Sequence, residues 1–177
     1  MPARYTCFPR TKPPLGFVNV IAGAFEKVDN AIGAASSQKR FGSDHVLGEL
    51  APVLLTLGFE VEQGKSRADR IDRPVFFGEG GEPSLNYQID AFHPIWSCGL
   101  EIEAGRGFMG NAFYRDLIQA MVMVQVDHLC IALLNRYEYA NTHSNDYDKA
   151  IGVADTLFAH DRIRVPFGLT VLGYGPL

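Results

Sequence analysis

Three acidic residues lie on two short segments whose alternating pattern is typical of neighbouring β-strands. Over 85–93, apolar residues alternate with polar ones, and Asp90 is on the polar side. The same alternation runs over 98–104, where Glu101 and Glu103 are on the polar side. Carboxylates grouped in this way are suited to hard divalent cations such as Mg²⁺, which can activate water and neutralise charge on a phosphate.

The two segments are close enough in the chain to form a hairpin with a four-residue turn at 94–97. That register places Asp90 directly opposite Glu101, and it places Gln88 opposite Glu103. Side chains paired in this way have Cβ atoms roughly 5 Å apart, and like charges there repel. Either a divalent cation offsets the repulsion, or the acids form the solvated face of an amphipathic hairpin. A register shift by two residues would keep the acids on one face but change the pairs.

The elements that would position this hairpin can be predicted from periodicity and from turn residues. We expect an extended lead-in at 1–14, helices at about 16–35, 43–57, 111–125 and 144–160, and further strands at 59–62, 128–134 and 169–174. Pro52 should kink the second helix, Gly58 should end it, and 78–83 should form a turn. The nearly continuous apolar run at 128–134 is typical of a central strand buried on both faces. These elements predict an α/β fold with a mixed central sheet and helices on both faces.

Composition is compatible with one packed domain spanning 1–177. The chain has 177 residues, of which 47% are apolar and 20% charged. Its three cysteines are odd in number and form no CxxC pair, which disfavours a disulfide framework or a zinc finger. No apolar stretch approaches the roughly 20 residues of a membrane span. We therefore expect a cytoplasmic protein with no membrane contact.

The net charge of −4 argues against a protein that coats nucleic acid by electrostatics alone. It is compatible with a protein that acts on nucleic acid through bound metal. If four acidic residues bind metal, the net charge of all the other residues is zero. The most basic stretch, 63–73, could contact a phosphate backbone, or it could be a solvated loop of mixed charge. Its cations are Lys65, Arg67, Arg70 and Arg73.

Several of these residues, taken in order, resemble the PD-(D/E)XK nuclease superfamily. The matching positions are Glu49 in an early helix, Asp90 on one strand, Glu101-Ile102-Glu103 on the next, and Arg115 and Gln119 on the following helix. The closest likeness is to type II restriction endonucleases that carry ExE in place of ExK. The resemblance covers about 44–136, which would be the nuclease core of a restriction-endonuclease-like fold.

The resemblance implies a metal-dependent endonuclease that hydrolyses double-stranded DNA. Asp90 and Glu101 would bind Mg²⁺, for which Mn²⁺ could substitute, and Glu49 would serve a second metal or its water shell. Glu103 occupies the place of the lysine that usually positions or activates the attacking water, and it would orient a metal-bound water instead. A homodimer is expected, because one site cuts one strand and two-fold symmetry matches a duplex.

Supporting roles are implied for three further side chains. Arg106 is the nearest cation in sequence and could stabilise the phosphate, while Arg115 and Gln119 line a polar stripe of their helix. Each of the three could equally be an ordinary exposed residue, and so could Glu49.

Two other functions compete with the nuclease interpretation. Because the usual lysine is missing, the chain could be a catalytically weak or inactive nuclease-fold protein that binds DNA or a protein partner. The run from Gly105 to Gly110 also fits GxGxxG between a strand and a helix, which is typical of dinucleotide binding. The two carboxylates on the preceding strand disfavour that alternative, since they would repel a pyrophosphate.

Overall fold

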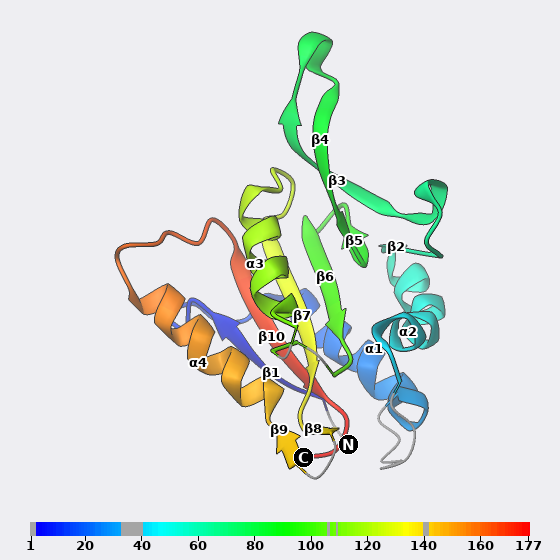
Figure 1. Ribbon diagram of the computed structural model, residues 1–177, viewed down its shortest axis with the longest axis vertical. Coiled ribbons are helices and arrows are strands. Elements are labelled where there is room, and N and C mark those ends of the chain that lie inside the picture. Colours follow the sequence, from blue (N-terminus) through cyan, green and yellow to red (C-terminus); the bar gives the residue numbers. More distant parts are fainter. Residues whose placement is uncertain (1–2, 33–40, 106, 109, 140–141) are drawn as a thin grey trace.

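A mixed β-sheet forms the centre of the molecule (Figure 1). The computed structural model describes residues 3–32, 41–105, 107–108, 110–139 and 142–177. The sheet has six strands in the order β1, β10, β7, β6, β5 and β2. Their bounds are β1 Arg4–Phe8, β2 Glu60–Val61, β5 Ala91–His93, β6 Cys98–Glu103, β7 His128–Leu134 and β10 Gly168–Tyr174.

The middle of the sheet is parallel and its edges are antiparallel. β7 pairs in parallel with both β6 and β10, whereas β1 runs antiparallel to β10, and β5 antiparallel to both β6 and β2. The helices are α1 Gly16–Ile32, α2 Ser43–Leu57, α3 Ala112–Val122 and α4 Asp146–Ala159. A parallel pair needs a long crossover connection, and α3 and α4 provide those between β6, β7 and β10.

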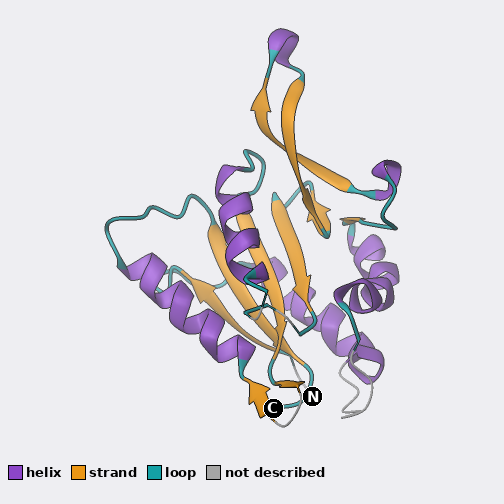
Figure 2. Cartoon of the chain, in the orientation of Figure 1, coloured by secondary structure: helices purple, strands orange, loops and turns teal. Residues whose placement is uncertain are grey.

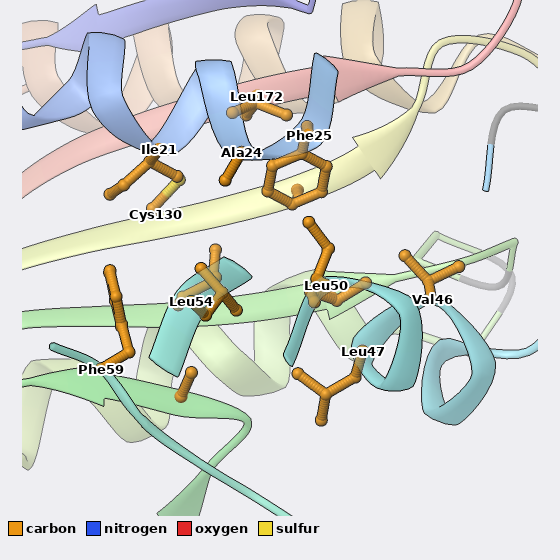
Figure 3. Close-up of a cluster of buried hydrophobic side chains, with 14 of the residues drawn as sticks. Ile21, Ala24, Phe25, Val46, Leu47, Leu50, Leu54, Phe59, Cys130 and Leu172 are labelled. Atoms are coloured by element: carbon orange, nitrogen blue, oxygen red, sulfur yellow. The ribbon is translucent and has the colours of Figure 1, made fainter. Parts of the chain in front are cut away.

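Helices cover both faces of the sheet, and each face has its own hydrophobic core. α1 and α2 pack on one face, where Phe25, Leu50 and Cys130 of β7 belong to one buried cluster and Cys130 lies beside Ile21 (Figure 3). α3 and α4 pack on the other face, where Phe113 lies in the same cluster as Ile131 of β7. Because alternate residues of β7 enter the two cores, the predicted central strand and the predicted fold class are confirmed.

The end of α2 is joined to the turn that precedes β6. Gly58 caps the helix in the left-handed conformation, with φ of 95°, as the sequence predicts. One residue earlier, the Leu57 carbonyl accepts a hydrogen bond from Nε2 of His93 at 3.0 Å. The other ring nitrogen of His93 accepts from the backbone N–H of Trp96 at 3.2 Å, and the Trp96 ring stacks on the imidazole. These contacts anchor the four-residue turn that the sequence predicts at 94–97.

Two strands leave the main sheet and form a separate ribbon, which we call the arm. β3 Ile71–Phe77 and β4 Pro83–Ile89 pair only with each other among the described residues, and they project beyond the six-stranded sheet (Figure 2). The predicted strand over 85–93 is therefore two strands, divided at Asp90. Gln88 pairs with Asp72 and not with Glu103, so that part of the predicted register is wrong. β4 does not pair with β6, because its backbone hydrogen bonds are made with β3.

Other differences concern elements with weak local patterns. The predicted lead-in at 1–14 contains edge strand β1, which depends on pairing with the distant β10. The charged stretch at 63–73 ends inside β3, and Pro74 of that strand is tolerated because a two-stranded ribbon leaves edge positions unpaired. A small hairpin of β8 Tyr137–Tyr139 and β9 Thr142–Ser144 was not predicted.

Within the described ranges, no helix has the length and apolar character needed to cross a membrane.

Candidate active site

Asp90 occupies the position where the chain passes from the arm into the main sheet. It is the one residue between β4 and β5, and its Oδ2 accepts a hydrogen bond of 2.8 Å from the backbone N–H of Ile102. The β5–β6 pairing has the predicted register and ends with Ala91 opposite Leu100. Continued by one residue, that register brings Asp90 beside Glu101. The β5–β6 backbone hydrogen bonds stop at Ala91. At the next residue, the Asp90 carboxylate itself bonds to the backbone of β6.

Glu101 and Glu103 lie on the opposite face of β6 from the first core. Their neighbours Leu100 and Ile102 pack into the cluster that α1 and α2 cover, and so the acids face α3. Glu101 is only 8% exposed, and the side chain of Glu103 is 12% exposed. Both carboxyls are largely removed from water, which excludes the alternative of a simple solvated face.

The neighbouring helix α3 contributes a cation and a fourth carboxylate. Nη2 of Arg115 lies 2.9 Å from Oδ1 of Asp116 and 3.4 Å from Oε1 of Glu103. The Asp116 side chain is 2% exposed, and its Oδ2 has no hydrogen-bond partner within the described structure. A buried oxygen without a partner is costly, which indicates that Asp116 is suited to a ligand or a water at this place.

Asp116 was missing from the sequence-based candidates, although a signal for it exists. It lies three residues after Phe113 and four before Ala120, on the apolar side of α3. A carboxylate within a buried helical stripe is rare unless it has a specific partner. Ser43 was also missed: its Oγ accepts a hydrogen bond of 3.1 Å from the backbone N–H of Ala104, which links the start of α2 to the end of β6.

These side chains line two adjoining cavities that share Asp90, Glu101 and Arg115. The first, which we call the acid cavity, has a volume of about 340 Å³ and is lined by Ser43, Asp90, Glu101, Ile102, Glu103, Gly110, Ala112 and Arg115. The second, which we call the amide cavity, has a volume of about 460 Å³ and is lined by Glu62, Asn86, Tyr87, Gln88, Ile89, Asp90, Glu101, Arg115, Asp116 and Gln119. The predicted acidic trio is therefore brought together.

Burial and mutual repulsion favour the protonated forms of the acids. Burial, with the Asp116 charge, raises the pKa of Asp90 to about 7, against the opposing effect of its hydrogen bond from Ile102. Burial and the Asp90 charge raise the pKa of Glu101 well above its usual range. Burial and the Asp116 charge raise the pKa of Glu103 to about 8. Arg115 is the one cation lining these cavities among the described residues, and it does not offset the four carboxyls.

The residues present fit a hard divalent cation. No three His, Cys, Asp or Glu side chains among the described residues already converge as a closed set of ligands. Mg²⁺ does not require such a set, because it keeps several waters and binds through one or two carboxylates together with substrate phosphate. Asp90 and Glu101 provide two such carboxylates. Asp116, whose Oδ2 has no partner within the described structure, lines the amide cavity together with them.

The other predicted site residues have different surroundings. Gln119 is half-buried in the wall of the amide cavity. Glu49 is exposed on α2 and lines neither of the two cavities. Arg106 lies outside the described residues, so its predicted role stays a prediction. Of the supporting residues, the structure brings Arg115 and Gln119 to the acids, and it does not bring Glu49.

The four basic residues predicted to contact nucleic acid differ in their availability. Arg73 pairs with Glu60 at 2.8 Å and lies over the Phe92 ring, so its charge is already used within the protein. Lys65 pairs with Asp44 on the surface, and Arg70 donates to Gln88. Arg67 is exposed. In the described part of the chain it has no polar partner.

Comparison with solved structures shows what the fold is similar to. No protein-family model and no curated protein sequence matches the chain. A crystal structure of the restriction endonuclease BglII complexed with a DNA 16-mer is similar to it, with a TM-score of 0.54 and 12% sequence identity. The match covers 100% of this chain and 78% of that chain. The fold is therefore restriction-endonuclease-like, as the sequence predicts.

Proposed function

We propose that this protein is a divalent-metal-dependent endonuclease that hydrolyses phosphodiester bonds in double-stranded DNA. We further propose that it belongs to the ExE branch of the PD-(D/E)XK superfamily. The observation that carries the proposal is the convergence of Asp90, Glu101, Glu103 and Asp116 around Arg115 in two adjoining cavities. A restriction-endonuclease-like fold supports it, since the similar BglII structure is complexed with DNA.

Each side chain has a definite part in the proposed reaction. Asp90 and Glu101 would hold Mg²⁺, or Mn²⁺ in its place, and the bound ion would acidify a water and neutralise charge on the phosphate. Glu103 would orient the attacking water and accept its proton, in the role that lysine has in most relatives. Its raised pKa, caused by burial and by Asp116, suits a proton acceptor near neutral pH once the neighbouring charges are offset.

Arg115 would approach the scissile phosphate and offset its negative charge. Asp116 is a positioning residue in this scheme, because its Oδ1 accepts a hydrogen bond from Nε of Arg115 and forms an ion pair with Nη2 at 2.9 Å. A guanidinium held by a buried carboxylate has a defined orientation, which a free surface arginine lacks. The side chain of Arg115 is 60% exposed and so remains accessible to a substrate.

Cleavage assays test the proposal directly. Supercoiled and linear DNA would be incubated with the protein in Mg²⁺, Mn²⁺ or EDTA, alongside Asp90→Asn and Glu101→Gln. We expect cleavage in either metal, none in EDTA, and a loss of at least about 100-fold in both variants, because metal ligands are removed. Glu26→Gln, an exposed α1 acid, is the matched control and should cleave like the wild type.

Metal-binding calorimetry identifies the alternative function. Absence of cleavage together with absence of Mg²⁺ binding would contradict the proposal and favour a non-catalytic nuclease-fold protein. Unfolding of both acid variants would indicate that the carboxyls are structural.

We also propose that the active form is a homodimer, since one such site cuts one strand of a duplex. Sedimentation in the presence of DNA and Ca²⁺ would measure the mass, and supercoiled DNA would report the type of break. A dimer should convert supercoiled DNA to linear DNA with little nicked intermediate. A monomer that only nicks would contradict this part of the proposal.

A further inference from the structure

Three amide side chains surround the cavity that adjoins the acids. Asn86 and Gln88 come from β4 of the arm, and Gln119 comes from α3. Asn86, Gln88 and Asp90 are spaced two residues apart, which places them on one side of the chain as it enters the sheet. All three line the amide cavity together with Glu101. The arm therefore carries neutral hydrogen-bonding groups to the edge of the proposed reaction site.

These amides have hydrogen-bonding capacity to spare. Asn86 is exposed and Gln119 is half-buried, and within the described part of the chain neither side chain has a hydrogen-bond partner in the protein. Oε1 of Gln88, an exposed side chain, accepts from Nη1 of Arg70 at 3.3 Å, which leaves its NH₂ group to donate elsewhere. An amide offers a donor and an acceptor side by side, and unused amides that line a cavity are suited to a polar ligand.

Charge in this cavity selects against a free phosphate. Its lining contains Glu62, Asp90, Glu101 and Asp116 but only Arg115 as a cation among the described residues. A phosphate could approach only where a metal ion or Arg115 offsets the carboxyls. The amide wall, in contrast, suits a ligand that is neutral and rich in donors and acceptors. The edges of nucleobases have these properties, and asparagine and glutamine recognise them by paired hydrogen bonds.

We infer that the amide cavity contacts base edges beside the scissile phosphate, with Asn86, Gln88 and Gln119 as specificity-determining residues. The inference rests on the proposed function and adds to it that cleavage depends on sequence. The arm suits this task, because a two-stranded ribbon can enter a groove of B-DNA. Arg70 lies beside this wall, since it donates a hydrogen bond to Gln88.

A pool of DNA duplexes with randomised positions tests the inference independently of cleavage. Wild-type protein and the variants Asn86→Ala, Gln88→Ala and Gln119→Ala would bind the pool in Ca²⁺, and the bound fraction would be sequenced. The same proteins would cleave the pool in Mg²⁺. Asn30→Ala is the matched control, since Asn30 is an exposed amide on α1. Urea denaturation would establish that each variant is folded.

We expect the wild type to enrich particular bases at defined positions. Each cavity variant should lose roughly 5- to 150-fold discrimination at one or two of those positions, while Asn30→Ala keeps the wild-type preference. Unchanged preferences in all three variants, or a wild type that binds without base preference, would overturn the inference and leave the proposed function standing. Sequence-selective binding without cleavage in Mg²⁺ would support the inference and contradict the proposed function. Absence of DNA binding would overturn both.

Discussion

Four carboxyl groups and one guanidinium share a small volume, and their electrostatic balance governs the site. Asp116 is the least exposed of the four, yet its charge is among the causes that raise the pKa of Asp90, Glu101 and Glu103. It also holds Arg115. Asp116 was not recognised from the sequence, yet it influences all three acids of the predicted trio, Asp90, Glu101 and Glu103.

Removing the Asp116 charge should lower the pKa of Glu103. After burial, the Asp116 charge is the largest cause that raises this pKa to about 8, so Asp116→Asn removes a repulsion from the ionised form of Glu103. We expect the Glu103 carboxyl to titrate at a lower pH, as measured by carbon NMR in EDTA. Asp161→Asn, at an exposed position distant in sequence, is the control. An unchanged Glu103 titration in Asp116→Asn would contradict the assigned cause.

Stability without metal should fall as the pH rises from 6.5 to 8.5. The pKa of Asp90 is about 7 and that of Glu103 about 8 in the folded state, against roughly 4 for such acids in an unfolded chain. The folded state therefore binds more protons, and its stability is lost as the pH rises through these values. We expect a loss of about 1–3 kcal/mol by urea denaturation in EDTA, because partial exposure of Glu103 weakens the effect.

The pH window separates this effect from an opposing one. Burial lowers the pKa of His128 to about 4, so His128 contributes stability that is lost as the pH falls from about 6.5 toward 4. In the unfolded chain this histidine is half protonated at about pH 6.5 and largely neutral by about pH 7.5, so its opposing effect is confined to the start of the window. Asp90→Asn should flatten the slope between pH 6.5 and 8.5, and an equally steep slope in that variant would contradict the assignment to Asp90.

At the scale of elements, the base of the arm requires close packing of β4 against β6. A Cβ at Gly99 of β6 would lie 2.3 Å from Cδ1 of Ile89, at the end of β4, and 3.5 Å from Cδ1 of Leu129 of β7. Ile89 is buried in the second core and has little room to move. The position of the arm relative to the acids therefore depends on a glycine in the strand that carries Glu101.

Gly99→Ala should destabilise the fold by about 1–3 kcal/mol, because the new methyl group overlaps Cδ1 of Ile89. Urea denaturation at pH 7 would measure the change. Combining it with Ile89→Val, which removes Cδ1, should restore part of the lost stability, so that the two effects are not additive. Additive losses in the double variant would show that the contact between these two residues is not the cause.

At the scale of the whole molecule, the site lies where three parts of the fold meet: the arm, the antiparallel edge of the sheet and α3. Each part packs through a different set of contacts, and a cation that binds the acids would stabilise all of them together. Metal binding should therefore be visible in global unfolding as well as in activity.

Mg²⁺ should raise the melting temperature of the wild type. At a concentration of 100 times its Kd, a ligand that binds only the folded state adds about 2.7 kcal/mol, which is roughly 5–10 °C for a chain of this size. Asp90→Asn should melt at or above the wild-type temperature in EDTA, because a repulsion is relieved, and should show almost no shift with Mg²⁺. An equal shift in the wild type and in this variant would place the cation elsewhere.

Local periodicity is enough to assign the faces of individual elements. Alternation with period two placed Asp90, Glu101 and Glu103 on one side, and the short turn set the register of β5 against β6. The continuous apolar run identified β7 as central, and helical periodicity located all four helices to within a few residues. These features are local, because a backbone of given periodicity shows the same side chains to the same face wherever it packs.

Which faces meet depends on long-range packing, which local periodicity does not reveal. The departure of β4 into the arm depends on pairing with β3, whose charges and proline resemble a loop in the sequence. The encounter of Asp116 with Glu103, and of Asn86 with the acids, depends on how α3 and the arm pack against β6. The position of Arg73 over the Phe92 ring and its pairing with Glu60 likewise depend on packing, and its predicted phosphate contact stays a prediction. Such contacts join residues far apart in the chain, and local periodicity does not specify them.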